Sequence, residues 1–268
     1  MQPEVVRFDA VEYDEARAQA CGGRHDRLQT RPYDLGKSVH LYPEAEDVFA
    51  DSIARHAEHL DPLVSIDLAC VSPELAGWVH VVLPKEPDLV GEYTQSFHNE
   101  YVSPNWISCS VTEDRCRFLG DFRFFVLAND PLPELPASYL NDWEQNRPLQ
   151  RTSYGDAKQR YRDSGWDSFR SQRPHSDDND GPLYQFKERA WQTNWEVAPP
   201  PPKAFRVTLS ESGSSDLWAG VSTADGRDLV FVASVQPGRY RDDSYSGPFQ
   251  TVLFYDPVES IAVQTFDW

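Results

Sequence analysis

His56 and His59 have the spacing that comes closest to a metal site in this chain. A helix over residues 43–60 would place side chains three residues apart on one face. Zinc proteases with two histidines on a helix space them four residues apart with a glutamate between, and the order here, His-Ala-Glu-His, is one residue short. The sequence offers no identifiable third ligand. We therefore expect a polar helix face, and neither a metal nor a cofactor.

The four cysteines offer a second kind of chemistry. Cys21 is followed by two glycines, Arg24 and His25, but a nucleophilic thiol needs a base held beside it in space, and sequence proximity does not supply one. Cys109 and Cys116 lie seven residues apart, which is not zinc-ribbon spacing, and Cys70 sits in an apolar run. Because the N-terminus carries no recognisable secretion signal, we expect free thiols and a cytoplasmic protein.

Two loops resemble ligand-binding motifs only in part. Gly36-Lys37-Ser38 matches the end of a phosphate-binding loop, but Arg31 stands where that loop needs its first glycine, so we predict a surface turn. Residues 176–181 resemble a calcium loop, but the position of the bidentate acid is occupied by Lys187. We predict a solvated acidic loop there.

Hydrolytic chemistry leaves no local signature. The serine-hydrolase motif Gly-x-Ser-x-Gly is absent from the sequence. Glycosidases use two carboxyl groups at a fixed separation, and 43 acids together with 34 aromatic residues permit such a site without locating it. A hydrolase or carbohydrate-active enzyme with a non-local acid or histidine site therefore remains an alternative.

Charge is the strongest compositional feature. The 268 residues have a formal net charge of −18, and residues 1–150 contain 26 acids against 12 bases. A field of this sign repels nucleic acid and anionic lipid and attracts basic proteins. Basic and aromatic residues alternate over residues 147–173, a pattern that nucleic-acid-binding domains show when they are basic overall. In this acidic chain we expect that segment to pair with the acidic first half.

The secondary structure that must position these side chains is predicted to include both helices and strands in the first half of the chain. A helix over residues 43–60 begins at Pro43, has acids in its first turn and ends at Asp61-Pro62. The two apolar runs 63–71 and 77–83 predict strands, and residues 116–128 predict another strand or a strand pair that bends at Gly120. We expect a short helix near residues 138–145 and a second helix over 155–172, interrupted by Gly165.

After four consecutive prolines at 199–202 the pattern becomes that of β-structure. Strands are predicted at 204–210, 216–223, 228–236, 250–256 and 260–267, separated by turn signals such as Asp225-Gly226. Residues 183–195 fit a helix or a strand equally well. The resulting class is α+β, with a mixed helix/strand region packed on a C-terminal antiparallel meander. We expect one domain over 1–268, with a possible sub-domain boundary at 199–202.

Three function classes follow. We expect a non-enzymatic acidic protein that binds a basic protein partner, as an inhibitor or immunity protein neutralises a toxin. Its contact surface would be the outer face of the first helix, formed by Glu44, Asp47, Asp51 and Glu58. The alternatives are the hydrolase described above and a structural or adaptor subunit that uses the prolines as a spacer. No run of about 18 apolar residues is present, so we expect no membrane helix.

Overall fold

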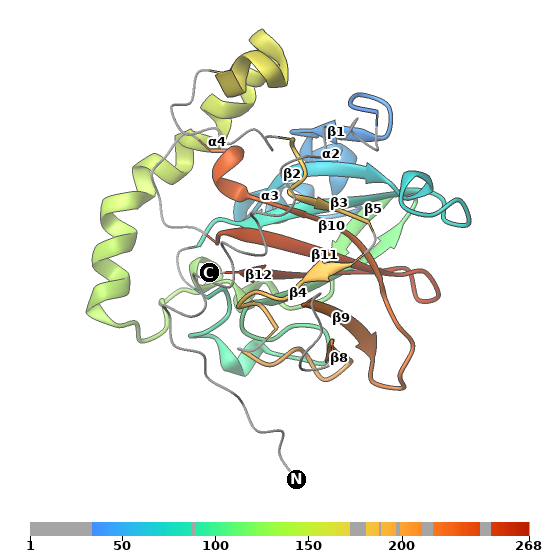
Figure 1. Ribbon diagram of the computed structural model, residues 1–268. Coiled ribbons are helices and arrows are strands. Elements are labelled where there is room, and N and C mark those ends of the chain that lie inside the picture. The colour runs from blue at the N-terminus through green and yellow to red at the C-terminus, as the bar shows by residue number, and fades with distance from the viewer. Residues whose placement is uncertain are drawn as a thin grey trace. The chain divides into compact units, whose positions relative to one another are not determined.

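Figure 1 shows the computed structural model, in which residues 35–268 belong to one compact unit. Within the described parts the side chains of residues 138, 142–151 and 166–171 are left aside. The described ranges are 34–86, 89–171, 181–187, 189–196, 199–210, 217–241 and 248–267.

The described residues form an α+β fold in which every strand pair within the sheets is antiparallel, as predicted. The helices are α2 (Ala45–Val48), α3 (Ile53–His59) and α4 (Ala137–Ser171). The strands of the first half are β1 (Val39–Leu41), β2 (Leu60–Asp67), β3 (Trp78–Pro84), β4 (Trp106–Thr112) and β5 (Arg115–Phe118). The later strands are β6 (Gln185–Phe186), β7 (Ala190–Trp191), β8 (Phe205–Leu209), β9 (Trp218–Thr223), β10 (Val230–Val235), β11 (Gln250–Asp256) and β12 (Ile261–Asp267).

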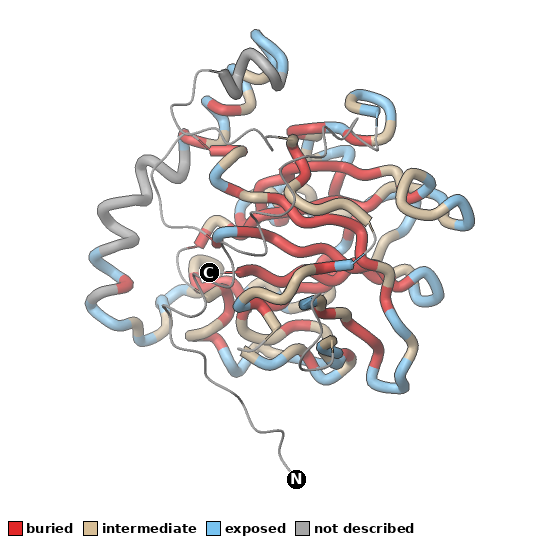
Figure 2. The backbone as a smooth tube through the Cα atoms, viewed as in Figure 1, coloured by how far each residue is buried: buried red, intermediate tan, exposed pale blue. Residues whose placement is uncertain are grey.

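A six-stranded sheet in the order β5-β4-β12-β11-β10-β6 forms the centre of the fold. Strands β10, β11 and β12 are consecutive neighbours, which confirms the predicted meander. Strand β4 joins the meander by pairing with β12, so that Val263 faces Ser108. All residues of β11 and β12 are buried, as Figure 2 shows by their colour. An antiparallel strand that is buried along its whole length must be covered on both faces.

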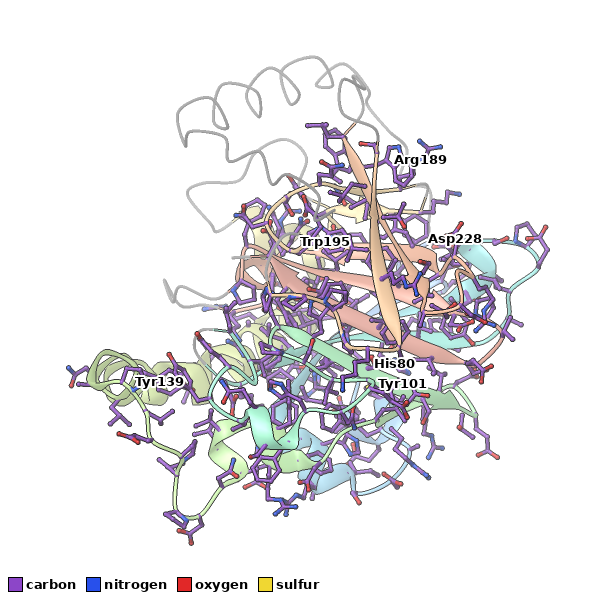
Figure 3. All side chains as sticks on the ribbon, turned by 90° about the horizontal axis from the view of Figure 1, so that it is seen from below. His80, Tyr101, Tyr139, Arg189, Trp195 and Asp228 are labelled. Carbon is purple, nitrogen blue, oxygen red and sulfur yellow. A yellow bond between two sulfur atoms is a disulfide. The ribbon has the colours of Figure 1, made fainter. Side chains whose placement is uncertain are left out.

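Two smaller sheets supply that cover. On one face, Val263 and Phe254 pack in a hydrophobic core with Val221 of β9 and Phe205 of β8, which belong to the sheet β7-β9-β8. Trp195 joins this core at 1% exposure and is marked in Figure 3. Neighbouring side chains of a strand point to opposite faces. Gln264 accordingly turns away from this core and accepts a hydrogen bond from the backbone N–H of Val82 in β3, at 2.9 Å.

The sheet β1-β2-β3 contains both apolar runs predicted as strands. β2 ends at Asp67, where the Asp67 carboxylate accepts a hydrogen bond from the Ala69 N–H and starts a short 3-10 helix. Within β2, Asp61 is buried and forms ion pairs with Arg241 at 3.0 Å and Lys85 at 3.1 Å. This buried charge therefore links β2 both to β3 and to the segment that follows β10.

The single helix predicted over residues 43–60 was wrong, because the chain leaves the helical path after Val48. Phe49 is extended and fully buried, and the N–H of Ala50 donates a hydrogen bond to the carbonyl of Cys116 in β5. Ser52 then adopts a left-handed backbone conformation, with φ of 44°, and α3 begins. Burial of Phe49 against β5 thus outweighs the helical periodicity of the sequence.

Helix α4 is longer than predicted, since it runs from Ala137 through Pro148 to Ser171. The predicted interruption at Gly165 is confirmed by its backbone angles, φ of 72° and ψ of 169°. At the start of the helix Tyr139 is buried and its ring lies edge-on to Tyr93, with 5.2 Å between centroids. Figure 3 marks Tyr139 on this helix.

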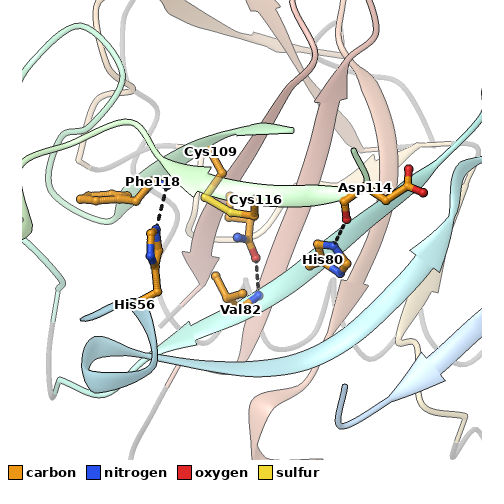
Figure 4. The surroundings of a disulfide bond; sticks show 8 residues. His56, His80, Val82, Cys109, Asp114, Cys116 and Phe118 are labelled. Carbon is orange, nitrogen blue, oxygen red and sulfur yellow. Dashed lines mark hydrogen bonds between the residues drawn. A yellow bond between two sulfur atoms is a disulfide. The ribbon is translucent and has the colours of Figure 1, made fainter. Parts of the chain in front are cut away.

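The expectation that all four thiols are free was wrong for one pair. Cys109 of β4 and Cys116 of β5 form a disulfide with 5.4 Å between their Cα atoms, as drawn in Figure 4. Cys109 lies opposite Phe118 and Cys116 opposite Val111, so the bond joins diagonal neighbours of the β4-β5 hairpin. The pairing of the two strands brings the cysteines together, which sequence spacing did not indicate. Cys70 is a free thiol, half-buried.

Three further predictions can be compared directly with the structure. Residues 183–195, left open between helix and strand, contain β6 and β7. Residues 116–128 form β5 up to Phe118 and then two 3-10 turns, instead of the predicted strand or strand pair. The four prolines at 199–202 lie between β7 and β8, and the central sheet takes strands from both sides of them.

A truncation tests the predicted boundary at 199–202. A chain of residues 1–198 lacks β11 and β12, so β4 would keep only β5 as a hydrogen-bonded neighbour and Asp61 would lose Arg241. We expect this fragment to show no cooperative unfolding transition in thermal circular dichroism, whereas the full chain should show one. A cooperative transition in the fragment would instead establish a separable sub-domain.

Candidate functional site

The four acids predicted as a contact surface lie on or beside α2 and α3. Two of them form ion pairs with basic side chains, and two do not. Asp51 pairs with Arg117 of β5 at 2.7 Å, and Glu44 pairs with Lys158 and Arg162 of α4. Asp47 and Glu58 are exposed, Glu58 to 66%, and within the described residues neither forms an ion pair with a lysine or arginine. We call Asp47 and Glu58 the open acids.

The basic segment 147–173 accounts for the occupation of Glu44. Lys158 Nζ lies 3.0 Å from one carboxylate oxygen of Glu44, and Arg162 binds the other oxygen. The side-chain hydrogen bond from Lys158 is the main reason that the pKa of Glu44 lies below its usual value. The predicted pairing of this segment with the acidic first half is thus confirmed at Glu44.

His56 anchors α3, and its hydrogen bonds fit the neutral form of the imidazole ring. His56 Nε2 accepts a hydrogen bond from the Phe118 N–H at 3.1 Å, and Nδ1 lies 3.3 Å from the Ser52 carbonyl (Figure 4). One nitrogen accepts and the other donates, which only neutral imidazole can do. Burial accordingly lowers the pKa of His56. This ring serves packing, so the polar helix face predicted at His56 was wrong.

His59 is buried as completely as His56 but has fewer polar contacts. Its side chain is 1% exposed and stacked parallel on the Phe125 ring at 5.1 Å, and neither ring nitrogen has a hydrogen-bond partner among the described residues. The Glu58 carboxylate lies 3.9 Å from Nε2. Burial lowers the pKa of His59 to about 4, so the ring is neutral at pH 7. The predicted polar face fails here too, because the α3 face that carries both histidines packs on phenylalanines.

Glu86 is a buried acid that the sequence analysis missed. Its Oε1 accepts a hydrogen bond from the Leu127 N–H at 3.0 Å, whereas Oε2 has no partner among the described residues. Burial raises the pKa of Glu86 to about 8, so this carboxyl is largely protonated at pH 7. The only signal in the sequence was its position directly after the apolar run 77–83.

A second carboxyl group with a raised pKa, that of Glu196, is partly buried near another acid, Asp267. The Glu196 carboxylate accepts a hydrogen bond from the Thr193 N–H, and the Asp267 carboxylate accepts one from the Asn194 N–H, each at 2.9 Å. Burial, and to a lesser extent the charge of Asp267, raises the pKa of Glu196 to about 7. Gln250, which is fully buried, donates to Thr193 Oγ1 and to Asp267. A carboxyl group whose pKa is raised and that lies near a second carboxyl group is typical of acid–base sites.

Among the described residues, the fold does not bring further ligands to the partial binding motifs noted in the sequence. In the described parts of the chain no group of three or more histidine, cysteine, aspartate or glutamate side chains is arranged to hold a metal ion. Gly36-Lys37-Ser38 forms a turn before β1, as predicted. Cys21, His25 and residues 176–180 of the acidic loop lie outside the described residues. The described helices include none that is both long and apolar enough to cross a membrane.

Comparison with models of known protein families, with curated proteins and with solved structures found no match to this chain.

Neutral burial of His59 predicts a pH-dependent stability. Between pH 6.5 and 4 the unfolded chain takes up a proton at residue 59 that the folded chain does not bind, so the wild type loses stability as the pH falls. His59→Phe removes this difference. Its free energy of unfolding relative to wild type should rise by on the order of 2 kcal/mol from pH 7.5 to pH 4.5 in urea titrations.

The matched control is His40→Phe, the same substitution at an exposed histidine. It should follow the wild-type pH dependence. If the free energy of unfolding of His59→Phe also follows the wild-type pH dependence, the fold does not hold His59 neutral.

Proposed function

We propose that this protein binds a basic protein partner through the acidic surface of α2 and α3, as an inhibitor or immunity protein would. The observation that carries the proposal is the pair of open acids, Asp47 and Glu58. Both are exposed and lack an internal basic partner among the described residues, although the fold pairs Glu44 and Asp51. Exposed, uncompensated charge on one surface accelerates encounter with a partner of opposite sign.

Rigid support of this surface favours the same function. α3 presents Glu58 to solvent while His56 and His59 on its other face are buried against phenylalanine rings. The short segment between α2 and α3 is held to β5 by the Ala50–Cys116 hydrogen bond and the Asp51–Arg117 ion pair. A surface that is already ordered loses less conformational entropy when it binds. The net charge of −18 adds a long-range attraction for a basic partner.

Charge reversal of the open acids tests this proposal. The wild type and the Asp47→Lys/Glu58→Lys variant are used as bait in native lysate at low and moderate salt, and retained proteins are identified by mass spectrometry. A basic partner retained by the wild type should be lost from the variant. Its association rate should fall about tenfold when Asp47 and Glu58 are reversed, because rim charges act mainly on encounter.

The control variant is Glu134→Lys/Asp228→Lys, which makes the same change in net charge at exposed acids away from α2 and α3. It should retain the partner nearly as well as the wild type. Equal loss from both variants would mean that only net charge matters, and capture of no basic partner at low salt would overturn the proposal.

A second candidate function is hydrolysis, and the pairing of Glu196 with Asp267 is what favours it. An acid with a pKa near 7, such as Glu196, can give a proton to a leaving group at neutral pH, and glycosidases use a second carboxyl group, here that of Asp267, as base or nucleophile. Activity would be sought on panels of p-nitrophenyl esters and glycosides. It should fall above pH 7, and Glu196→Gln should lower it at least about 100-fold, with Glu74→Gln as an exposed control. Activity unchanged by Glu196→Gln would exclude this site.

A further inference from the structure

One face of α4 carries the contacts that hold its middle section against the rest of the fold. Tyr154, Ala157, Lys158 and Tyr161 follow the spacing i, i+3, i+4 and i+7, which places them on one side of a helix. Ala157 is fully buried, and the tyrosine rings lie 5.6 and 5.3 Å from the ring of Tyr42. This part of α4 is therefore an amphipathic helix whose inner face is aromatic and basic.

The surface that receives this helix is formed by Tyr42, Pro43, Glu44, Pro62 and Tyr240, and we call it the α4-contact surface. The Tyr154 hydroxyl donates to the carbonyl of Pro62, and Lys158 Nζ donates to the carbonyl of Pro43 at 3.2 Å. Glu44 then binds Lys158 and Arg162 together. The surface thus offers an aromatic platform, two backbone acceptors and one carboxylate.

The ionic part of this contact is exposed to solvent. Arg162 is 48% exposed and Glu44 is 50% exposed, whereas the Lys158 side chain is 14% exposed. An ion pair as exposed as that of Arg162 with Glu44 contributes little to stability, because water and salt screen it. The tyrosine contacts and hydrogen bonds supply the rest, and any helix with the same groups at the same spacing could make them. The surface therefore has the chemistry of a site where one helix can replace another.

The position of Glu44 connects this surface with the open acids. Glu44 precedes α2 directly, and Asp47 lies on α2 one turn later. A basic partner drawn to Asp47 would reach the α4-contact surface next, where Glu44 is already neutralised by α4. A second copy of this chain, at −18 net charge, would be repelled from the same place.

We propose that the α4-contact surface is a helix-binding site, and that α4 occupies it as an internal competitor of a basic partner helix. That helix would carry aromatic residues at i and i+7, a lysine at i+4 and an arginine at i+8, matching Tyr154, Tyr161, Lys158 and Arg162. The inference rests on the proposed function only for the identity of the partner as a basic protein. Displacement of α4 would free Glu44 to join the open acids in binding.

The test uses the full chain and a fluorescent peptide of residues 150–164 as the probe. Lys158→Glu/Arg162→Glu places two acids against Glu44 and should drive α4 off its surface. We expect this variant to bind the peptide at least about tenfold more tightly than the wild type in fluorescence anisotropy. The milder Lys158→Ala/Arg162→Ala variant should have a peptide affinity between those of the wild type and the charge-reversed variant. It tests the proposal even when charge reversal impairs folding.

Lys203→Glu/Arg206→Glu is the matched control, because it makes the same charge change at exposed residues of β8 and its approach. It should bind the peptide like the wild type. Adding Glu44→Lys to the Lys158→Glu/Arg162→Glu variant should restore the internal contact. It should then abolish peptide binding and recover protection of residues 152–164 in hydrogen exchange.

Three outcomes would overturn the inference. The first is equal peptide affinity for the wild type, the α4 variants and the control, and the second is no binding to any of them. The third is a dimer of Lys158→Glu/Arg162→Glu in light scattering, which would mean that the surface takes a second copy of this chain. The peptide assay needs no natural partner, so its failure alongside partner capture by the open acids would leave the proposed function standing.

Discussion

Burial of β11 and β12 on both faces is the constraint on which the rest of the structure depends. Each strand has all seven of its residues buried, so the six-stranded sheet needs a layer on either side. The sheet β7-β9-β8 supplies one layer and β3 approaches the other, where Gln264 binds the Val82 N–H. The two proposed contact surfaces lie at the margins of this arrangement. α2 and α3 are held to β5, the edge strand of the central sheet, and the α4-contact surface adjoins β1 and β2.

The sequence predicted local elements better than their partners. Strands β2, β3 and β8 to β12 were recognised because apolar runs bounded by turn residues are a local signal. The pairing of β4 with β12 was not recognised, because it joins residues about 150 positions apart and leaves no trace in spacing. The same gap explains the two main errors, the continuous helix over 43–60 and the free thiols at Cys109 and Cys116. Both errors concern contacts of β5, which is held in place by its pairing with β4. These contacts are the hydrogen bond from Ala50 to Cys116 and the disulfide between Cys109 and Cys116.

The candidate site could be predicted as a region but not residue by residue. Amphipathicity placed Glu44, Asp47, Asp51 and Glu58 on the outer side of the first helical segment, and charge predicted that the basic segment would pair with acids. Neither argument could say that Glu44 is the acid chosen by α4, because the contact depends on the approach of Tyr42 to Tyr154 and Tyr161. Glu86 and Glu196 were lost among 43 acids because their distinction is burial.

The buried titratable groups give the folding reaction an unusual proton balance. Near pH 5.5 the folded chain holds Glu86 and Glu196 protonated and His59 neutral, whereas the unfolded chain has the opposite preference at all three. Unfolding therefore releases protons from two carboxyl groups and takes one up on an imidazole. Because these three groups together release about one proton to the buffer, the calorimetric enthalpy of unfolding near pH 5.5 should vary with the heat of ionisation of the buffer. The folded protein thus holds protons on two carboxyl groups that it exchanges with the solvent when it unfolds.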